Sequence, residues 1–94
     1  MGADRIGVVV CNTPPLPSEF SVGDMDIGGP AMINAAIKNY RNVLVFTSPS
    51  QYSAGLERLG SQALSVQYRQ ELASQAAQHV AAYSLNVAAL PELS

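Results

Sequence analysis

The sequence is poor in the residues that build disulfides, metal sites and charged surfaces. It has one cysteine, Cys11, and one histidine, His79, which excludes an intrachain disulfide and a Cys/His zinc site. It has no tryptophan, only 13% of its residues are charged, and its net charge is -2. The five basic residues are scattered, so no basic patch could follow a nucleic-acid backbone. We therefore exclude nucleic acid as a partner and expect no metal.

Long hydrophobic runs are also missing. No stretch approaches the roughly 20 apolar residues that a membrane span needs. The first residues lack the basic segment and long apolar run of a secretory signal. We therefore expect a cytoplasmic protein without membrane contact. The chain is nevertheless 48% hydrophobic over 94 residues, which is too apolar for disorder and enough for one small core. With so little charge, part of that apolar surface is expected to meet another chain.

The hydrophobic pattern predicts two strands and three helices. The run at 5–12 is continuous and β-branched, which is typical of a parallel strand buried on both faces. A proline-rich loop follows and leads to a helix over 28–40, with Pro30 in its first turn. The remaining elements are a buried strand at 42–46, a helix at 48–60 and a long helix from 65 to about 89. A strand–helix–strand crossover makes the two strands parallel.

The last two helices have recognisable ends and faces. Ser48 or Ser50 fits the N-cap of the helix at 48–60, and Gly60 fits its end.

The long helix would measure roughly 37 Å, which is more than two strands can cover, and two strands are too few for an independent sheet. We therefore expect a dimer or a chain that docks on a partner. The apolar stripe of the long helix consists of Leu64, Tyr68, Leu72, Ala76, Val80, Tyr83, Val87 and Leu90.

The segment DIGGPAMINAAIKN, at 26–39, carries a resemblance to a known family. It is similar to the "DIGGP-x-M-hydrophobic-x-A-A-x-K-N" segment of the IMP cyclohydrolase domain in the bifunctional AICAR transformylase/IMP cyclohydrolase family. Upstream, VVVCN resembles the strand that ends in that family's "VVxNLYPF" motif. Downstream, RNVLVFTSPSQY resembles "xxVxVVxDPxDY", and LSVQYRQELASQAAQHVAAYSLNVAAL resembles "LSxxxRxxLAxxAFxHTAxYDxxIAxxL". The resemblance covers nearly the whole chain after Arg5.

The resemblance implies a methylglyoxal-synthase-like, Rossmann-like α/β fragment. It has a short parallel sheet, a crossover helix and a long C-terminal helix, and it forms a single partial cyclohydrolase-like domain over residues 1–94. In that family the domain closes the ring of formyl-AICAR to give inosine monophosphate (IMP), in de novo purine biosynthesis. Ring closure needs no cofactor. The implied partners are purine nucleotides and a second chain, either another copy in a homodimer or a complementing subunit.

The matching positions imply a site. Asp26 and Lys38 match the family's catalytic Asp and Lys, Gly28 and Gly29 match glycines that line the nucleotide, and Asn12 matches an asparagine near the base. The two glycines suit this role physically, because backbone N–H groups at a helix start can approach an anionic or carbonyl oxygen closely where no side chain intervenes. Lys38 lies roughly 13 Å further along the helix axis. Asp26 and Lys38 therefore stand at opposite ends of one helix, and either the ligand is long or the lysine serves another subunit's pocket.

The chain also departs from the family pattern. Pro14 stands where the family has a tyrosine, and proline cannot donate a hydrogen bond to an oxyanion. The family's serine-rich phosphate loop, a further segment with a catalytic lysine and the transformylase domain have no counterpart in these residues. We therefore expect little or no cyclohydrolase turnover from this chain alone. Two hypotheses remain: an incomplete cyclohydrolase homologue that needs a complementing polypeptide, and a non-catalytic interaction or dimerisation module derived from the purine enzyme.

Each candidate residue also has a purely structural interpretation. Asp26 can be a loop carboxylate that stabilises a helix start, and Lys38 an ordinary lysine at a helix end. Cys11 is expected to be buried at a strand end, with nothing basic nearby to activate it. His79 is expected to be a packed or surface residue of the long helix. Tyr68 and Tyr83 are most simply core or interface residues.

Overall fold

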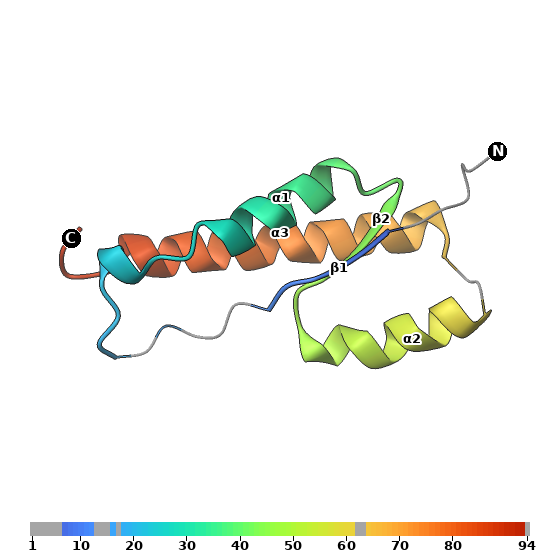
Figure 1. The fold of residues 1–94 in the computed structure, drawn as a ribbon, viewed down its shortest axis with the longest axis horizontal. Coiled ribbons are helices and arrows are strands. Elements are labelled where there is room, and N and C mark those ends of the chain that lie inside the picture. Colours follow the sequence, from blue (N-terminus) through green and yellow to red (C-terminus); the bar gives the residue numbers. More distant parts are fainter. Residues whose placement is uncertain (1–6, 13–15, 17, 62–63, 94) are drawn as a thin grey trace.

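The computed structural model describes residues 7–12, 16, 18–61 and 64–93, which form one elongated α/β unit (Figure 1). Its elements, in chain order, are β1 (Gly7–Val10), the 3₁₀ turn η2 (Val22–Asp24), α1 (Gly28–Lys38), β2 (Val43–Phe46), the 3₁₀ turn η3 (Pro49–Gln51), α2 (Tyr52–Ser61) and α3 (Val66–Ala88). The predicted succession of strand, helix, strand and two helices is confirmed. None of the described helices has the length and apolar character needed to cross a membrane.

The two strands form a parallel sheet. Gly7 lies opposite Val43 and Val10 lies opposite Phe46. The pairing continues one residue beyond β1, where the backbone N–H of Cys11 donates to the carbonyl oxygen of Phe46 over 2.9 Å. A short sheet with a crossover helix and a long final helix is consistent with a Rossmann-like fragment, as the sequence predicted.

The prediction that the first strand is buried on both faces is wrong. Val8 and Val10 remain 48% and 56% exposed, whereas Leu44 and Val45 of β2 are fully buried. The difference arises because α1 and α3 both pack on β2. Among the described residues, no strand pairs with the outer edge of β1. β1 has the sequence pattern of a central strand, but it lies at an exposed edge of the sheet.

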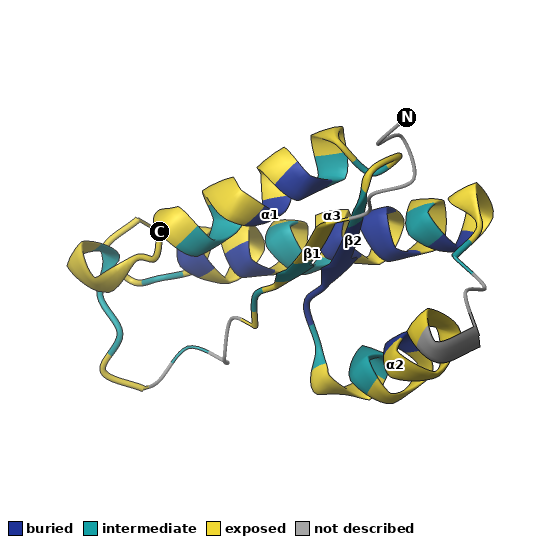
Figure 2. Cartoon of the chain, turned by 45° about the vertical axis from the view of Figure 1, so that its right-hand side comes forward, coloured by how far each residue is buried: buried dark blue, intermediate teal, exposed yellow. Residues whose placement is uncertain are grey.

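The core lies where α1, β2 and α3 meet, and α1 runs along α3 (Figures 1 and 2). The predicted stripe of α3 is confirmed, because Val80 is half-buried and most of its other members are buried. α1 covers part of the length of α3 that two strands cannot reach. The buried residues that pack together in this cluster are Ile33, Ala36, Leu44, Val45, Phe46, Tyr68, Leu72 and Ala76.

The connection after β2 is capped as predicted, but α2 ends later. The Ser48 hydroxyl accepts a hydrogen bond from the Ser50 N–H, and Gln51 bonds back to the Ser48 N–H, so Ser48 caps η3. α2 then continues through Gly60 to Ser61, so Gly60 does not terminate it. Across the sheet, Gly55 of α2 lies directly against the ring of Phe46. The missing side chain at Gly55 is what allows this close contact.

Candidate functional site

Four of the five predicted site residues lie where β1 ends and α1 begins. The Cys11 Sγ, directly after β1, lies 3.8 Å from the carbonyl oxygen of Gly29 and donates a weak hydrogen bond to it. Asn12 is the next residue and is exposed, as are Asp26 and Gly28. Open α/β sheets bind ligands at this position, outside the carboxyl ends of the strands. The tertiary structure therefore brings Asn12, Asp26, Gly28 and Gly29 to the same end of the sheet.

Hydrogen bonds fix both the side chain and the backbone of Asp26. Its Oδ1 accepts a hydrogen bond from the Gly29 N–H over 3.0 Å, and its own N–H donates to the hydroxyl of Tyr83 over 2.8 Å. The first bond satisfies one of the unpaired N–H groups of the helix start and places a negative charge at the positive end of α1. This is the contact that the structural interpretation of Asp26 predicts. The residue nevertheless remains exposed, so its carboxylate is accessible to a ligand.

The two glycines of the α1 start are not equivalent. A Cβ atom at Gly29 would collide with the Asp26 carboxylate and would lie 3.4 Å from the Cys11 Sγ. A Cβ atom at Gly28 would meet nothing within 4 Å. Gly29 is therefore required by the packing around Asp26, whereas Gly28 faces open space, where a ligand could approach the backbone.

Lys38 lies apart from the other candidates. It is the last residue of α1 and is exposed, whereas Asp26 precedes the first residue of that helix by two positions. The helical rise over Gly28–Lys38 places Lys38 roughly 15 Å along the axis from the helix start that Asp26 precedes. The structure therefore confirms that the two residues stand at opposite ends of the helix and does not bring them together.

The residue pattern did not predict two contacts of this region. Tyr83 is buried in α3 as predicted, but its hydroxyl also holds the Asp26 N–H. Glu92, just beyond α3, accepts a hydrogen bond from the Val22 N–H over 2.6 Å and so ties η2 to the C-terminal end. The only sequence signal for the first contact was that Tyr83 is one of two tyrosines on a stripe that is otherwise aliphatic. Pro14 lies outside the described residues.

Cys11 and His79 belong to no metal-binding group of described residues. Cys11 is half-buried rather than buried, and His79 is half-buried on α3. Within the described ranges, no three His, Cys, Asp or Glu side chains are grouped closely enough to hold a metal ion.

Comparison with known proteins places this arrangement in a family. The model of the AICARFT/IMPCHase bienzyme matches residues 36–92, which is more than half of the chain. A bifunctional purine biosynthesis protein PurH of Prochlorococcus marinus (strain MIT 9211) is 39% identical over 92 residues, covering 88% of this chain and 18% of the relative. The PurH protein of Cutibacterium acnes is 38% identical over 89 residues, covering 86% of this chain and 17% of the relative.

A third relative agrees with these two. The PurH protein of Oceanobacillus iheyensis is 35% identical over 75 residues, covering 80% of this chain and 15% of the relative. The chain thus spans less than a fifth of the length of the relatives it matches. Because the matches cover most of this chain in three distinct organisms, we conclude that it belongs to the AICARFT/IMPCHase bienzyme family.

Proposed function

We propose that this chain carries part of the family's IMP cyclohydrolase site and contributes to closing formyl-AICAR to IMP once a second polypeptide completes the domain. The observation that carries the proposal is the Asp26 carboxylate, which is fixed beside the N-terminus of α1 and is still exposed. It lies in a segment that resembles the family's cyclohydrolase motif, in a chain that belongs to the family.

The chemistry of ring closure suits this arrangement. A proton must leave the attacking carboxamide nitrogen, and negative charge develops on the formyl oxygen. Asp26 would accept or relay the proton, because its bond to Gly29 fixes its position. The open backbone at Gly28, at the positive end of α1, would face the developing charge, and Asn12 would contact the base. In this proposal Lys38 is also catalytic, and its distance from Asp26 assigns it to the pocket of another copy.

The exposed apolar groove beside β1 supports the need for a second polypeptide. It has a volume of about 270 Å³ and lies between β1 and α2. Val10 is 56% exposed and Leu56 is 70% exposed at its rim. A two-stranded sheet with an open apolar edge is rarely stable alone and invites pairing with further strands. A complementing subunit or a second copy of the chain would cover this groove.

The same groove favours a second candidate function, a non-catalytic interaction or dimerisation module. In that case the chain keeps the family's packing surface without the chemistry. The distance between Lys38 and the other site residues favours this reading for an isolated chain, because one copy cannot bring both charged groups to a small substrate.

Calorimetric titration of the chain with IMP and with AICAR tests the nucleotide site. Asp26→Asn keeps the size of the side chain and an oxygen that can accept the Gly29 N–H, but removes the charge. We expect saturable binding that weakens at least several-fold in Asp26→Asn and in Lys38→Ala. Asp24→Asn is the matched control, since it makes the same change two residues earlier, in η2. A millimolar dissociation constant corresponds to a binding free energy of roughly -4 kcal/mol, the weakest binding that this titration can detect. Absence of heat at millimolar ligand would overturn the nucleotide site and leave the interaction module.

A further inference from the structure

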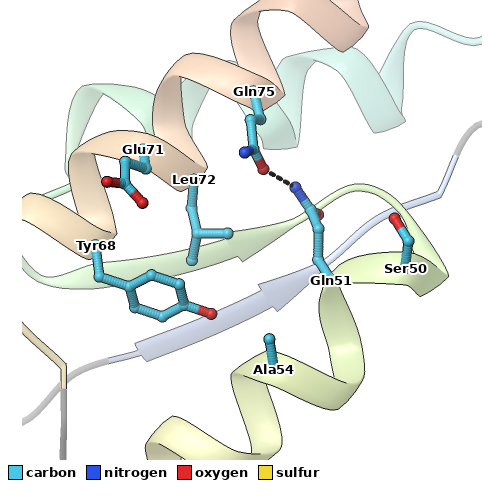
Figure 3. A pocket seen from close by; sticks show the side chains of 7 residues that line it. All are labelled: Ser50, Gln51, Ala54, Tyr68, Glu71, Leu72 and Gln75. Carbon is cyan, nitrogen blue, oxygen red and sulfur yellow. Dashed lines mark hydrogen bonds between the residues drawn. The ribbon is translucent and has the colours of Figure 1, made fainter.

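A second, polar pocket lies away from the start of α1, between α2 and α3. It has a volume of about 290 Å³ and is formed by η3, the start of α2 and the first turns of α3 (Figure 3). Leu72 and Ala54 supply apolar surface, whereas the remaining lining side chains are polar or aromatic, namely Ser50, Gln51, Tyr68, Glu71 and Gln75. Its volume is near the lower end of the range of small-molecule sites. None of the site residues Asn12, Asp26, Gly28, Gly29 and Lys38 lines it.

One wall of the pocket is held in place by hydrogen bonds. The Gln51 Oε1 accepts from the backbone N–H groups of Thr47, over 2.8 Å, and Ser48, over 3.2 Å. The Gln51 Nε2 donates to the Gln75 Oε1, as the dashed line in Figure 3 marks. This arrangement ties η3 to α3 and fixes the orientation of the Gln75 amide. Its Nε2 has no side-chain hydrogen bond with any residue in the described part of the chain. The pocket therefore has a pre-formed polar wall with an available donor.

The Tyr68 hydroxyl is the unsatisfied group of this pocket. Tyr68 is only 8% exposed, and its hydroxyl oxygen has no hydrogen-bond partner among the described residues. The ring projects from α3 toward Ala54, and the guanidinium of Arg58 lies 4.2 Å from the ring centroid, which restricts the ring's orientation. Buried polar groups in native proteins are nearly always paired, so an unpaired hydroxyl lining a pocket indicates a missing partner.

The charge of the pocket limits what that partner can be. Burial raises the pKa of the Tyr68 hydroxyl above its usual 10.0, and it outweighs the nearby Arg58 cation, so the hydroxyl keeps its proton and can donate. The Glu71 carboxylate is close enough to raise that pKa further. A negative carboxylate opposes an anionic ligand and accepts hydrogen bonds from an N–H group.

We propose that this pocket binds a small neutral ligand that carries a carboxamide. The ligand's carbonyl oxygen accepts hydrogen bonds from the Tyr68 hydroxyl and the Gln75 Nε2, its N–H group donates to Glu71, and its apolar part lies on Leu72 and Ala54. This combination satisfies the orphaned hydroxyl and the free amide donor together. The inference does not depend on the nucleotide site at the start of α1.

Titration of the ¹⁵N-labelled chain with benzamide, followed by ¹H–¹⁵N correlation spectra, tests the proposal. We expect saturable shifts at the backbone amides of Gln51, Glu71 and Gln75, with the amides of Gly28 and Gly29 unmoved. Benzoate has the same shape with a negative charge, and benzamidine replaces the carbonyl with a cationic amidine. Both should bind at least several-fold more weakly than benzamide. Equal or tighter binding of either would overturn the carboxamide assignment, as would an absence of shifts at tens of millimolar benzamide.

A variant isolates the hydroxyl from the ring. Tyr68→Phe keeps the aromatic ring and its stacking with Arg58, and it removes only the unpaired group, so the fold should survive. We expect it to weaken benzamide binding roughly three- to tenfold, the effect of one neutral hydrogen bond. Tyr40→Phe, which removes a hydroxyl outside the pocket, should bind as the unaltered chain does. Unchanged affinity in Tyr68→Phe would show that the hydroxyl is not the binding group and would overturn the proposal.

Discussion

The backbone N–H of Asp26 donates a hydrogen bond to the hydroxyl of Tyr83, 57 residues later, over 2.8 Å. This single contact joins the loop before α1 to the buried face of α3, and so positions the candidate carboxylate relative to the core. It also makes the two buried tyrosines of α3 physically different, because Tyr83 has a hydrogen-bond partner and the Tyr68 hydroxyl has none in the described part of the chain.

Phenylalanine substitutions at Tyr68 and Tyr83 should have different effects on the free energy of unfolding. Tyr83→Phe leaves the partly buried Asp26 N–H without its acceptor, and should lower the free energy of unfolding by about 0.5–1.5 kcal/mol. Tyr68→Phe removes a hydroxyl that has no partner among the described residues, and should leave stability unchanged or raise it. Urea denaturation followed by circular dichroism measures both. An equal loss of unfolding free energy in the two variants would contradict the hydrogen bond between Asp26 and Tyr83.

Alanine at the two glycines of α1 should have opposite effects. Gly29→Ala places a methyl group against the Asp26 carboxylate and should break the Asp26–Gly29 hydrogen bond, at a cost of about 1 kcal/mol. Gly28→Ala meets nothing and restricts the unfolded chain, so it should be neutral or stabilise by up to about 0.5–1 kcal/mol. The difference in urea midpoint between the two variants is the measurement. A ranking in which Gly28→Ala is the less stable would be evidence against this geometry.

The packing of α2 on β2 depends on Gly55. A methyl group there would collide with the ring of Phe46, which is itself buried, and overpacking of this kind costs about 1–3 kcal/mol. We expect Gly55→Ala to lower the thermal midpoint and to change the near-ultraviolet circular dichroism of the aromatic residues. Gly23→Ala is the control, since a methyl group there comes no closer than 3.7 Å to its nearest neighbour. A fully stable Gly55→Ala would mean that α2 is free to move away from the sheet.

Stability should fall at alkaline pH partly because of Tyr68. Its pKa is raised in the folded chain by burial, so the folded state holds this proton more tightly than the unfolded state does. Relative to the neutral range, the free energy of unfolding is unaffected below the unfolded pKa near 10.0 and falls as pH rises from there through the higher folded pKa, because the buried hydroxyl resists ionisation. Unfolding free energies measured between pH 9 and 11.5 should fall less steeply in Tyr68→Phe than in the unaltered chain. Parallel profiles would show that Tyr68 titrates normally.

The groove beside β1 should govern association. Leu56→Glu places a charge on a residue that is 70% exposed, so the monomer should keep its stability to within about 0.5 kcal/mol. Association with a second chain should weaken at least tenfold, because the charge would be desolvated in the covered groove. Leu93→Glu is the control, since Leu93 is also exposed but lies after α3, away from the groove. Sedimentation equilibrium of the chain and both variants gives the result, and association that survives in Leu56→Glu would place the partner elsewhere.

Local patterns were sufficient for much of the fold. The three- and four-residue spacing of apolar residues predicted α3 and its buried face, and Ser65 accepts a hydrogen bond from the Tyr68 N–H at the predicted helix start. The Gly-Gly-Pro start of α1 and the strand–helix–strand order were predicted in the same way. These features depend on side-chain periodicity and capping within a few residues, so they can be inferred without knowing which segments meet.

Strand burial, the assembly of the site and the pairing of buried polar groups depended on contacts between segments that are distant in the sequence. The Val-rich run of β1 predicts burial, yet Val8 and Val10 are exposed, because burial of a strand requires partners at its edge and face. The composition of the candidate site was predicted from the segment DIGGPAMINAAIKN and from the strand end VVVCN. Its assembly was not, because the hydroxyl of Tyr83, the sulfur of Cys11 and the Asp26 carboxylate come from positions far apart in the chain. Residue spacing placed Lys38 at the far end of α1. Only packing revealed that the Tyr68 hydroxyl lies buried with no partner in the part of the chain that the structure describes, since whether a polar group is satisfied depends on atoms contributed by other elements.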